Sequence, residues 1–216
     1  QGRYEDAAKM YQESLKIKEE LGDKRGIAIT RYQLGMIHQD QGRYEEAEKM
    51  YQESLKLSEK LGDKRGIAST RHQLGNVHYV QGRYEDAAKM YQESLKISEE
   101  LGDKSGIATT LHQLGMIHQQ QGKYEEAEKM YQESLKIKEE LGNKSGIAFT
   151  LGQMGRISHA QEKYKETLRC YLHAFVIFNE LNSPYKDLAK RDISKLKEEI
   201  GDSLFDRYYE ELTANE

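Results

Sequence analysis

The feature that most constrains the fold of this chain is an internal repeat of forty residues. A block that reads QGRYEDAAKMYQESLKIKEELGDKRGIAITRYQLGMIHQD starts at residue 1, near-copies start at residues 41, 81 and 121, and a degraded copy starts at residue 161. Self-similarity at a fixed period of this length is typical of chains in which each repeat is a small supersecondary unit that stacks on its neighbours. The sequence therefore predicts a repeat protein.

Each block contains two stretches with the apolar spacing of a helix. One stripe lies within residues 43–60 and another within residues 64–80, and the remaining faces carry glutamate and lysine. A lone pair of such helices cannot bury its apolar stripe, so neighbouring pairs must pack on one another. We predict an all-α fold, a right-handed α-solenoid of antiparallel helix pairs.

Sixteen of the eighteen glycines fall at four places in the block. Gly22 and its equivalents follow a helical pattern and precede Asp or Asn, which predicts a left-handed residue at the helix end and an N-cap for the next helix. Gly42 and its equivalents mark the other turn. Gly35 and its equivalents lie inside a helix, where glycine costs about 1 kcal/mol against alanine. We predict that two backbones approach closely there.

The repeated residues resemble the tetratricopeptide repeat family. The matching pattern is Leu34-Gly35, His38, Gly42, Tyr44, Ala47 and Tyr51, and it recurs forty residues later. The family's usual period is about 34 residues, and the longer first helix found here is similar to that of Partner-of-Inscuteable/LGN-type adaptors and of bacterial and archaeal signalling proteins. The resemblance covers residues 1–180 and implies a non-catalytic scaffold for protein–protein interaction.

The two ends depart from the pattern. The unit that starts at residue 1 opens on a second helix and lacks its first helix, and the chain does not begin with methionine, so we expect a fragment with an uncovered N-terminal helix capable of self-association. Residues 165–178 are apolar on more than one face and need cover on both sides. We predict a covering helix over 184–200, with Ser183-Pro184 at its start, and a short last helix from Gly201. Residues 1–180 would form the solenoid and residues 181–216 its capping helices.

Composition excludes several classes of protein. No stretch approaches eighteen uninterrupted apolar residues, so no membrane span is predicted. The net charge of -4 argues against a nucleic-acid-binding protein, whose surface would be basic. The single Cys170 cannot form an internal disulfide, which fits a reducing compartment, and we expect a cytoplasmic protein.

No motif with catalytic or metal-binding chemistry emerges from the repeats. His38, His78 and His118 recur one unit apart, whereas stacked helices lie about 8–10 Å apart and zinc needs nitrogens within about 2.1 Å of one point. The Gly-Asp-Lys-Ser-Gly run at 102–106 lacks the residue order of a phosphate-binding loop. Cys170 has no basic partner in sequence and is expected to be a core thiol. We predict no enzyme activity, no metal and no cofactor.

The functional signal is the difference between repeats. The second helices hardly change, whereas the first helices vary on one face, which in the resembling family lines a concave groove that holds peptides. Drift on an exposed face is the alternative, but the varying residues include aromatic, methionine and arginine side chains that are enriched at interfaces. The predicted groove residues are Arg25, Ile29, Arg31, Tyr32, Met36, Arg65, Arg71, His72, Asn76, Tyr79, His112, Met116, Phe149 and Arg156.

The predicted groove is polarised. Arginines of the first two units are replaced by serine and leucine in the next two, so we expect a cationic N-terminal half and a more apolar C-terminal half. The hypothesis is a scaffold that binds an acidic peptide with apolar anchors. Two alternatives stay open, namely the sensor or oligomerisation arm of a larger signalling ATPase and a self-assembling solenoid.

Overall fold

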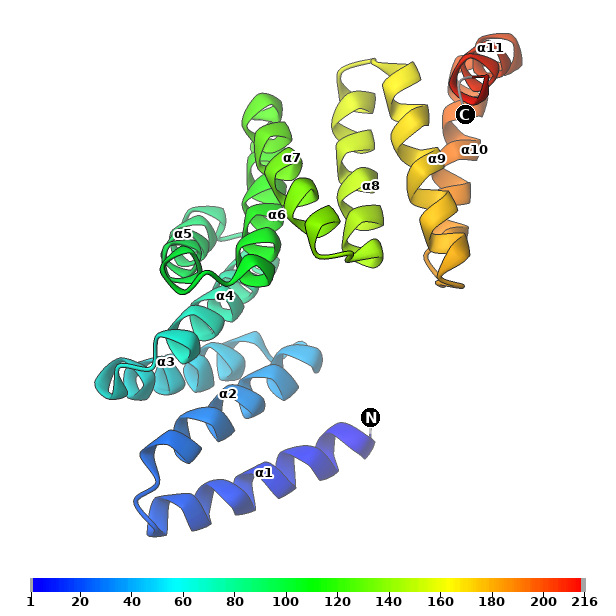
Figure 1. Ribbon diagram of the computed structural model, residues 1–216. Helices are drawn as coiled ribbons and strands as arrows, with labels where there is room; N and C mark the ends of the chain where they lie inside the picture. The colour runs from blue at the N-terminus through cyan, green and yellow to red at the C-terminus, as the bar shows by residue number, and fades with distance from the viewer. Residues whose placement is uncertain (1, 215–216) are drawn as a thin grey trace. The chain divides into compact units, whose positions relative to one another are not determined.

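The computed structural model describes residues 2–214, and the side chains of residues 4–214, and all regular secondary structure in that part of the chain is α-helical (Figure 1). The helices are α1 (Gly2–Glu20), α2 (Lys24–Asp40), α3 (Tyr44–Leu61), α4 (Lys64–Val80), α5 (Tyr84–Leu101), α6 (Lys104–Gln120), α7 (Tyr124–Glu140), α8 (Lys144–Ala160), α9 (Tyr164–Glu180), α10 (Lys186–Ile200) and α11 (Asp202–Thr213). We call α2, α4, α6 and α8 the A helices, and α1, α3, α5, α7 and α9 the B helices. The all-α fold with two helices per block is confirmed.

The chain divides into two compact units, Gln1–Thr110 and Leu111–Glu216. In unit 1 each helix from α1 to α5 packs on the next, and the A helices α2 and α4 also touch. In unit 2 the same serial packing runs from α7 to α11, and α11 also returns to α9. Each helix thus packs mainly on its neighbours in sequence, as expected of stacked helical repeats.

From α1 to α9 the helices are joined by corners of two or three residues that repeat along the chain. Gly62 ends α3 with a left-handed φ of 65°, and its N–H donates to the Glu59 carbonyl at 3.2 Å. The next N–H, of Asp63, donates to the Ser58 carbonyl at 2.9 Å. Asp63 is also the N-cap of α4, because its Oδ1 accepts the Gly66 N–H at 3.0 Å. One glycine and one carboxylate therefore end one helix and start the next, as the sequence predicted.

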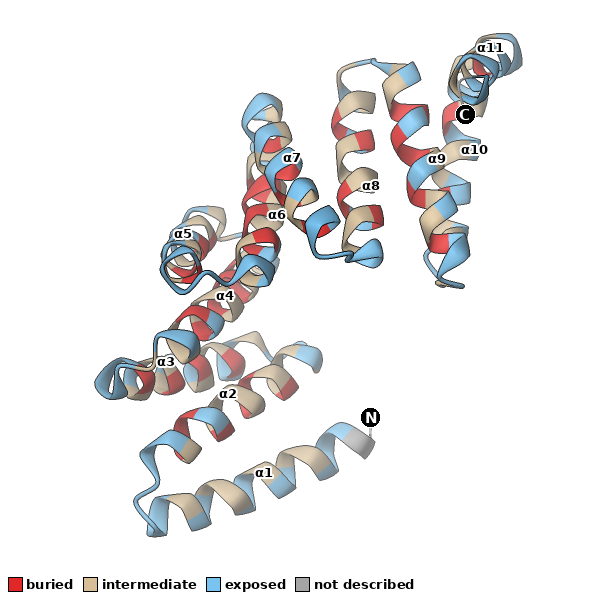
Figure 2. Cartoon of the chain, viewed as in Figure 1, coloured by how far each residue is buried: buried red, intermediate tan, exposed pale blue. Residues whose placement is uncertain are grey.

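The core is a thin layer between A and B helices (Figure 2). The buried positions of α3 are Ala47, Tyr51, Ser54 and Ser58, one face of the helix that includes two serines besides the expected apolar residues. The ring of Tyr51 lies over Gly35 of α2, where a Cβ would be 2.6 Å from Cε1. The prediction that two backbones meet at this glycine is wrong in that respect, because the close neighbour is the tyrosine ring of the following helix.

The C-terminal helices cover the apolar α9. Leu168 of α9 is fully buried against Leu196 of α10 and Phe205 of α11. The covering helix begins at Lys186, two residues later than expected, since Ser183 and Pro184 form the turn before it and the Ser183 hydroxyl accepts the Tyr185 N–H at 3.3 Å. The second face of α9 thus has the partner that its apolar composition requires.

The first helix exposes apolar side chains. Tyr4, Met10 and Ile17 of α1 and Leu21 in the corner after it are all exposed, although α2 packs against the other side of the helix. The exposure of Tyr4 agrees with the uncovered N-terminal helix expected from the sequence. None of the helices in the described part of the chain is both long and apolar enough to cross a membrane.

Candidate functional site

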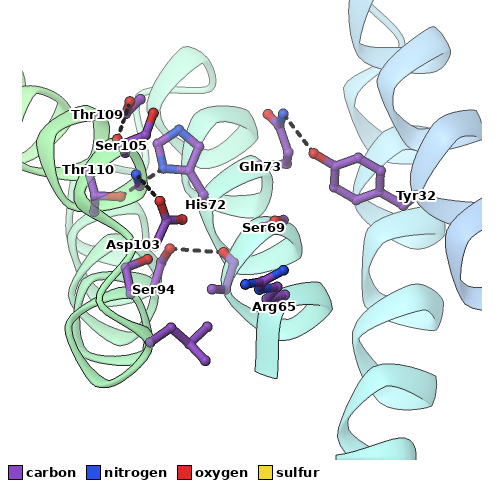
Figure 3. A pocket seen from close by; sticks show the side chains of 14 residues that line it. Tyr32, Arg65, Ser69, His72, Gln73, Ser94, Asp103, Ser105, Thr109 and Thr110 are labelled. Atoms are coloured by element: carbon purple, nitrogen blue, oxygen red, sulfur yellow. Dashed lines mark hydrogen bonds between the residues drawn. The ribbon is translucent and has the colours of Figure 1, made fainter. Parts of the chain in front are cut away.

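Two adjoining hollows in unit 1 are lined by the A helices and floored by a B helix. The first, of about 270 Å³, lies between α2 and α4 over α3. The second, of about 420 Å³, lies between α4 and the first turns of α6 over α5 (Figure 3). We call them the α2–α4 hollow and the α4–α6 hollow. Both are bounded by Tyr32, Arg65 and Ser69, so they form one continuous depression along the A helices.

The predicted residues that meet here are Arg25, Ile29, Tyr32, Arg65 and His72. Arg25, Ile29 and Arg65 line the α2–α4 hollow and their side chains are exposed. Among the described residues, neither guanidinium is held in an ion pair. Two arginines one repeat apart therefore present free positive charge at the mouth of the depression, where a negatively charged ligand group would be stabilised.

Tyr32 and His72 occupy equivalent positions in successive A helices and form the walls of the depression. Each ring packs against the buried tyrosine of the next B helix, Tyr32 at 5.7 Å from Tyr51 and His72 at 5.3 Å from Tyr91 between ring centroids. Gln73 Nε2 donates to the Tyr32 hydroxyl at 3.3 Å (Figure 3). Burial lowers the pKa of His72 to about 4, so this wall is neutral at physiological pH.

The hollows are open because serine replaces lysine on their floors. The four B helices α1, α3, α5 and α7 carry Lys18, Ser58, Ser98 and Lys138 at one equivalent position. Lys138 is 5% exposed, and its Nζ donates to Thr150 Oγ1 at 2.8 Å. Ser58 and Ser98 are too short to fill that space and instead line the two hollows. Sequence reasoning missed this position because the B helices looked constant, although the exchange itself was visible.

Arg31 and Arg71, predicted to line the groove, do not reach it. Arg31 lies 3.1 Å from Glu19 of α1 and 3.2 Å from Glu53 of α3, measured from nitrogen to carboxylate oxygen. Arg71 makes the same pair of contacts one repeat later, to Glu59 and Glu93. Both guanidiniums therefore join two consecutive B helices and are already paired with carboxylates. The cationic half of the groove is reduced to Arg25 and Arg65.

Three further predicted residues are packed against the core. Met36 contacts the cluster around Tyr51, and Met116 contacts the cluster around Tyr131. His112 packs its ring 5.2 Å from that of Tyr131, and its Nδ1 lies 3.1 Å from Thr150 Oγ1. Burial lowers the pKa of His112 to about 3. These three side chains contact the core between helices and do not line either of the two hollows.

Asn76 and Tyr79 vary together for an internal reason. In two repeats the buried tyrosine hydroxyl donates to a glutamine, as Tyr51 does to Gln39 Oε1 at 2.9 Å. The equivalent of that glutamine in α4 is Tyr79, which cannot supply the amide oxygen, and Tyr91 donates to Asn76 Oδ1 at 2.6 Å instead. Tyr79 packs on Tyr84, with ring centroids 5.5 Å apart. This variation replaces one hydrogen-bond acceptor with another and needs no ligand to explain it.

Phe149 and Arg156 line a smaller hollow in unit 2, of about 60 Å³. Gly152, which replaces the tyrosine or histidine of the other A helices, has no neighbour within 4 Å of a Cβ position. Tyr185, from the segment before α10, partly covers Phe149, with ring centroids 4.7 Å apart, and Phe149 stays 39% exposed. Arg156 lies 4.0 Å from Asp192. Part of the predicted apolar half of the groove is thus covered by Tyr185 of the same chain.

The described residues contain no cluster of His, Cys, Asp or Glu that could hold a metal ion. His78 of the recurring histidine set is buried at a corner beside Arg83, where burial lowers its pKa. Cys170 is buried, and burial raises its thiol pKa to about 11, which disfavours the reactive thiolate. These side chains are positioned for packing.

Comparison with known proteins agrees with the architecture. The family model described as tetratricopeptide repeat matches residues 1–60 and 66–140. No curated protein sequence matches the chain significantly. The crystal structure of BtubC (BKLC) from P. vanneervenii is 21% identical, with a TM-score of 0.80 over 95% of this chain and 89% of that chain. The apo form of RapI is 15% identical, with a TM-score of 0.71 over 92% of this chain and 57% of that chain.

A third solved structure, MamA, is 16% identical, with a TM-score of 0.61 over 84% of this chain and 92% of that chain. At these identities the likenesses show the fold alone. They match the repeat architecture and leave the ligand to be argued from the residues of the groove.

Proposed function

We propose, from the premise that the chain belongs to the tetratricopeptide repeat family, that it is a non-catalytic scaffold whose unit 1 binds an acidic peptide segment along the A helices. The family fold serves protein interaction, and the depression across α2, α4 and α6 is a concave feature of unit 1 with free positive charge at its mouth. Apolar anchors of the ligand would meet Ile29 and Tyr32.

The observation that carries the proposal is the contrast between two kinds of arginine. Arg31 and Arg71 are each paired with two glutamates, whereas Arg25 and Arg65 face the depression in no ion pair of the described residues. An exposed, unpaired guanidinium beside a hollow is available to a carboxylate, which it can bind through two parallel hydrogen bonds. A partner with two acidic side chains supplies one carboxylate to Arg25 and one to Arg65.

The repeat also sets the spacing of those acidic residues. Arg25 and Arg65 occupy the same place in adjacent A helices, whose axes are expected to lie about 8–10 Å apart. An extended peptide advances about 3.3–3.6 Å per residue. We therefore propose an extended ligand with acidic residues about three positions apart.

A peptide selection tests the proposal. A phage library of twelve-residue peptides, in which glutamate is the only acidic residue, is selected against the whole chain. The tightest-binding peptide is then synthesised with a fluorescein label. Anisotropy titration is expected to give affinities about tenfold weaker for Arg25→Glu and for Arg65→Glu. Binding should also weaken as salt is raised, because the contacts are exposed.

Arg207→Glu is the matched control, since it makes the same charge change on the exposed surface of α11 in unit 2. The Arg207→Glu variant should bind the peptide as tightly as the unmodified protein does. If both groove variants bind as tightly as this control, or if no acidic peptide is selected, the proposal is wrong.

Exposed apolar residues on α1 favour a second candidate function, self-association. Met10 is 70% exposed, whereas its equivalent Met50 in α3 is partly buried. We propose that a second copy of the chain covers this face of α1. Light scattering over a dilution series should then show a mean mass that decreases as the protein is diluted. The double variant Met10→Lys/Ile17→Lys should stay monomeric at every concentration. A monomeric mass throughout contradicts this candidate.

A further inference from the structure

We propose that the α4–α6 hollow is a side-chain pocket that takes a glutamate of the ligand, inserted between the A helices down to Ser98 of α5. The inference rests on the proposed peptide-binding function and adds to it a specific subsite. It also assigns a role to the one position at which the inner B helices α3 and α5, with Ser58 and Ser98, both differ from the outer B helices α1 and α7, with Lys18 and Lys138. Serine there opens the pocket, and lysine closes it.

The outer repeats show what fits in this space. Lys138 occupies the equivalent position in unit 2, where its four-carbon chain is buried and its Nζ reaches Thr150 Oγ1 at 2.8 Å. Lys18 makes the same 2.8 Å contact with Thr30 in unit 1. The α4–α6 hollow has the same wall groups, since His72 Nδ1 lies 3.2 Å from Thr110 Oγ1 and His112 Nδ1 lies 3.1 Å from Thr150 Oγ1. The space left by Ser98 therefore accommodates a side chain of comparable length.

The chemistry inside the hollow suits an anionic end group. Ser98 is 2% exposed and lines the hollow; its carbonyl accepts the Asp103 N–H at 2.9 Å, whereas its hydroxyl makes no hydrogen bond with another described residue. The hydroxyl borders the hollow with its proton available, so a carboxylate oxygen inserted there would accept it. Arg65 stands at the mouth of the same hollow. A glutamate can therefore be held by a hydroxyl inside and a guanidinium outside.

The one carboxylate in the lining is already engaged. Asp103 Oδ1 accepts the Gly106 N–H at 3.0 Å and caps α6. Ser105 and Gly106, also in the lining, belong to the first turn of that helix, whose N-terminal dipole favours negative charge. The wall residue His72 is neutral and does not repel either charge. Arg65 and the helix end thus offset the charge of Asp103.

The test fills the pocket in two ways that differ in charge. Ser98→Lys reproduces the residue found at Lys138, and Ser98→Met fills the same space without charge. The probe is the fluorescein-labelled peptide selected above. Both variants are expected to bind it about tenfold more weakly, although Ser98→Lys adds a positive charge that would strengthen attraction at the surface. Thermal unfolding followed by circular dichroism shows that each variant is folded.

Matched variants separate this inference from the proposed function. Lys138→Ser makes the reverse exchange in unit 2 and should leave the affinity unchanged. Replacing the inserted glutamate of the peptide by aspartate should lower its affinity for the unmodified protein about tenfold. The same replacement should not lower the affinity for Ser98→Met any further.

The possible results lead to distinct conclusions. If both Ser98 variants bind within twofold of the unmodified protein while Arg65→Glu does not, the peptide binds in the groove without insertion and the inference is wrong. If Arg25→Glu and Arg65→Glu also bind normally, the proposed function fails as well.

Discussion

At the scale of single residues, each repeat contains a glycine that makes room for an aromatic ring. A Cβ on Gly75 would lie 2.5 Å from Cε1 of Tyr91, whose side chain is fully buried and cannot move away. We predict that Gly75→Ala destabilises the protein by about 1–3 kcal/mol by overpacking, despite the better helix propensity of alanine. Urea denaturation measures the change.

The chain supplies its own control for that substitution. Gly152 also lies inside an A helix, and its Cβ position has no neighbour within 4 Å. Gly152→Ala should therefore stabilise the protein by up to about 1 kcal/mol. Equal effects at Gly75 and Gly152 would show that helix propensity, and not the Tyr91 ring, decides the cost.

Burial of a single lysine gives the stability a pH dependence. Burial lowers the pKa of Lys138 from 10.5 to about 8. Between these values the unfolded chain binds more protons than the folded chain, so stability rises with pH in this range, and the full penalty is present below pH 8. Lys138→Met should raise the free energy of unfolding by about 1–3 kcal/mol at pH 7.

The advantage of Lys138→Met over the unmodified protein should shrink as the pH is raised from 8 to 10. Chemical denaturation at a series of pH values measures it, and Lys136→Met, on the exposed face of the same helix, is the control. A constant advantage across that range would contradict the assignment to Lys138.

At the scale of helices and corners, one position breaks the glycine rule. Gly42, Gly82 and Gly122 have φ values between 72° and 75°, whereas their equivalent in the last repeat, Glu162, adopts a φ of 58°. A side chain in the left-handed region costs about 1–2 kcal/mol, partly offset by the greater freedom of glycine in the unfolded chain. We predict that Glu162→Gly stabilises the protein by about 1 kcal/mol, measured by urea denaturation.

The reciprocal change is the control for that corner. Gly122→Glu places the same side chain at a φ of 72° and should cost about as much as Glu162→Gly gains. A loss of stability in Glu162→Gly would mean that contacts of the Glu162 side chain outweigh the backbone strain.

Elements were easier to predict from the sequence than the site. Period, helix pairs and corners follow from local signals, so α3 and α4 lie within a residue of their expected ranges. The groove residues depend on neighbours that a single helix does not reveal. Arg31 lies on the varying side of α2, yet it reaches glutamates on both adjacent B helices. Position 98 carries serine where α1 and α7 carry lysine, and only the packed structure shows that this exchange opens a hollow.

At the scale of the whole molecule, the serial packing of helices explains the polar composition. Only 37% of the residues are hydrophobic, because a stack of repeats has a thin core and much surface. Stability in such a stack is a sum of local terms between neighbours. A defect at one end is therefore expected to act locally, unlike a defect in a globular core.

Phe205 allows a direct measurement of that locality. It closes unit 2 by packing from α11 on Leu168 and Leu196. We predict that Phe205→Ala lowers the free energy of opening of α9, α10 and α11 by about 3–5 kcal/mol and leaves α2 to α5 unchanged. Hydrogen exchange followed helix by helix measures both, with Leu141→Ala, at an exposed corner, as the control. Faster exchange by the same factor in every helix would instead mean that the chain unfolds as a single cooperative unit.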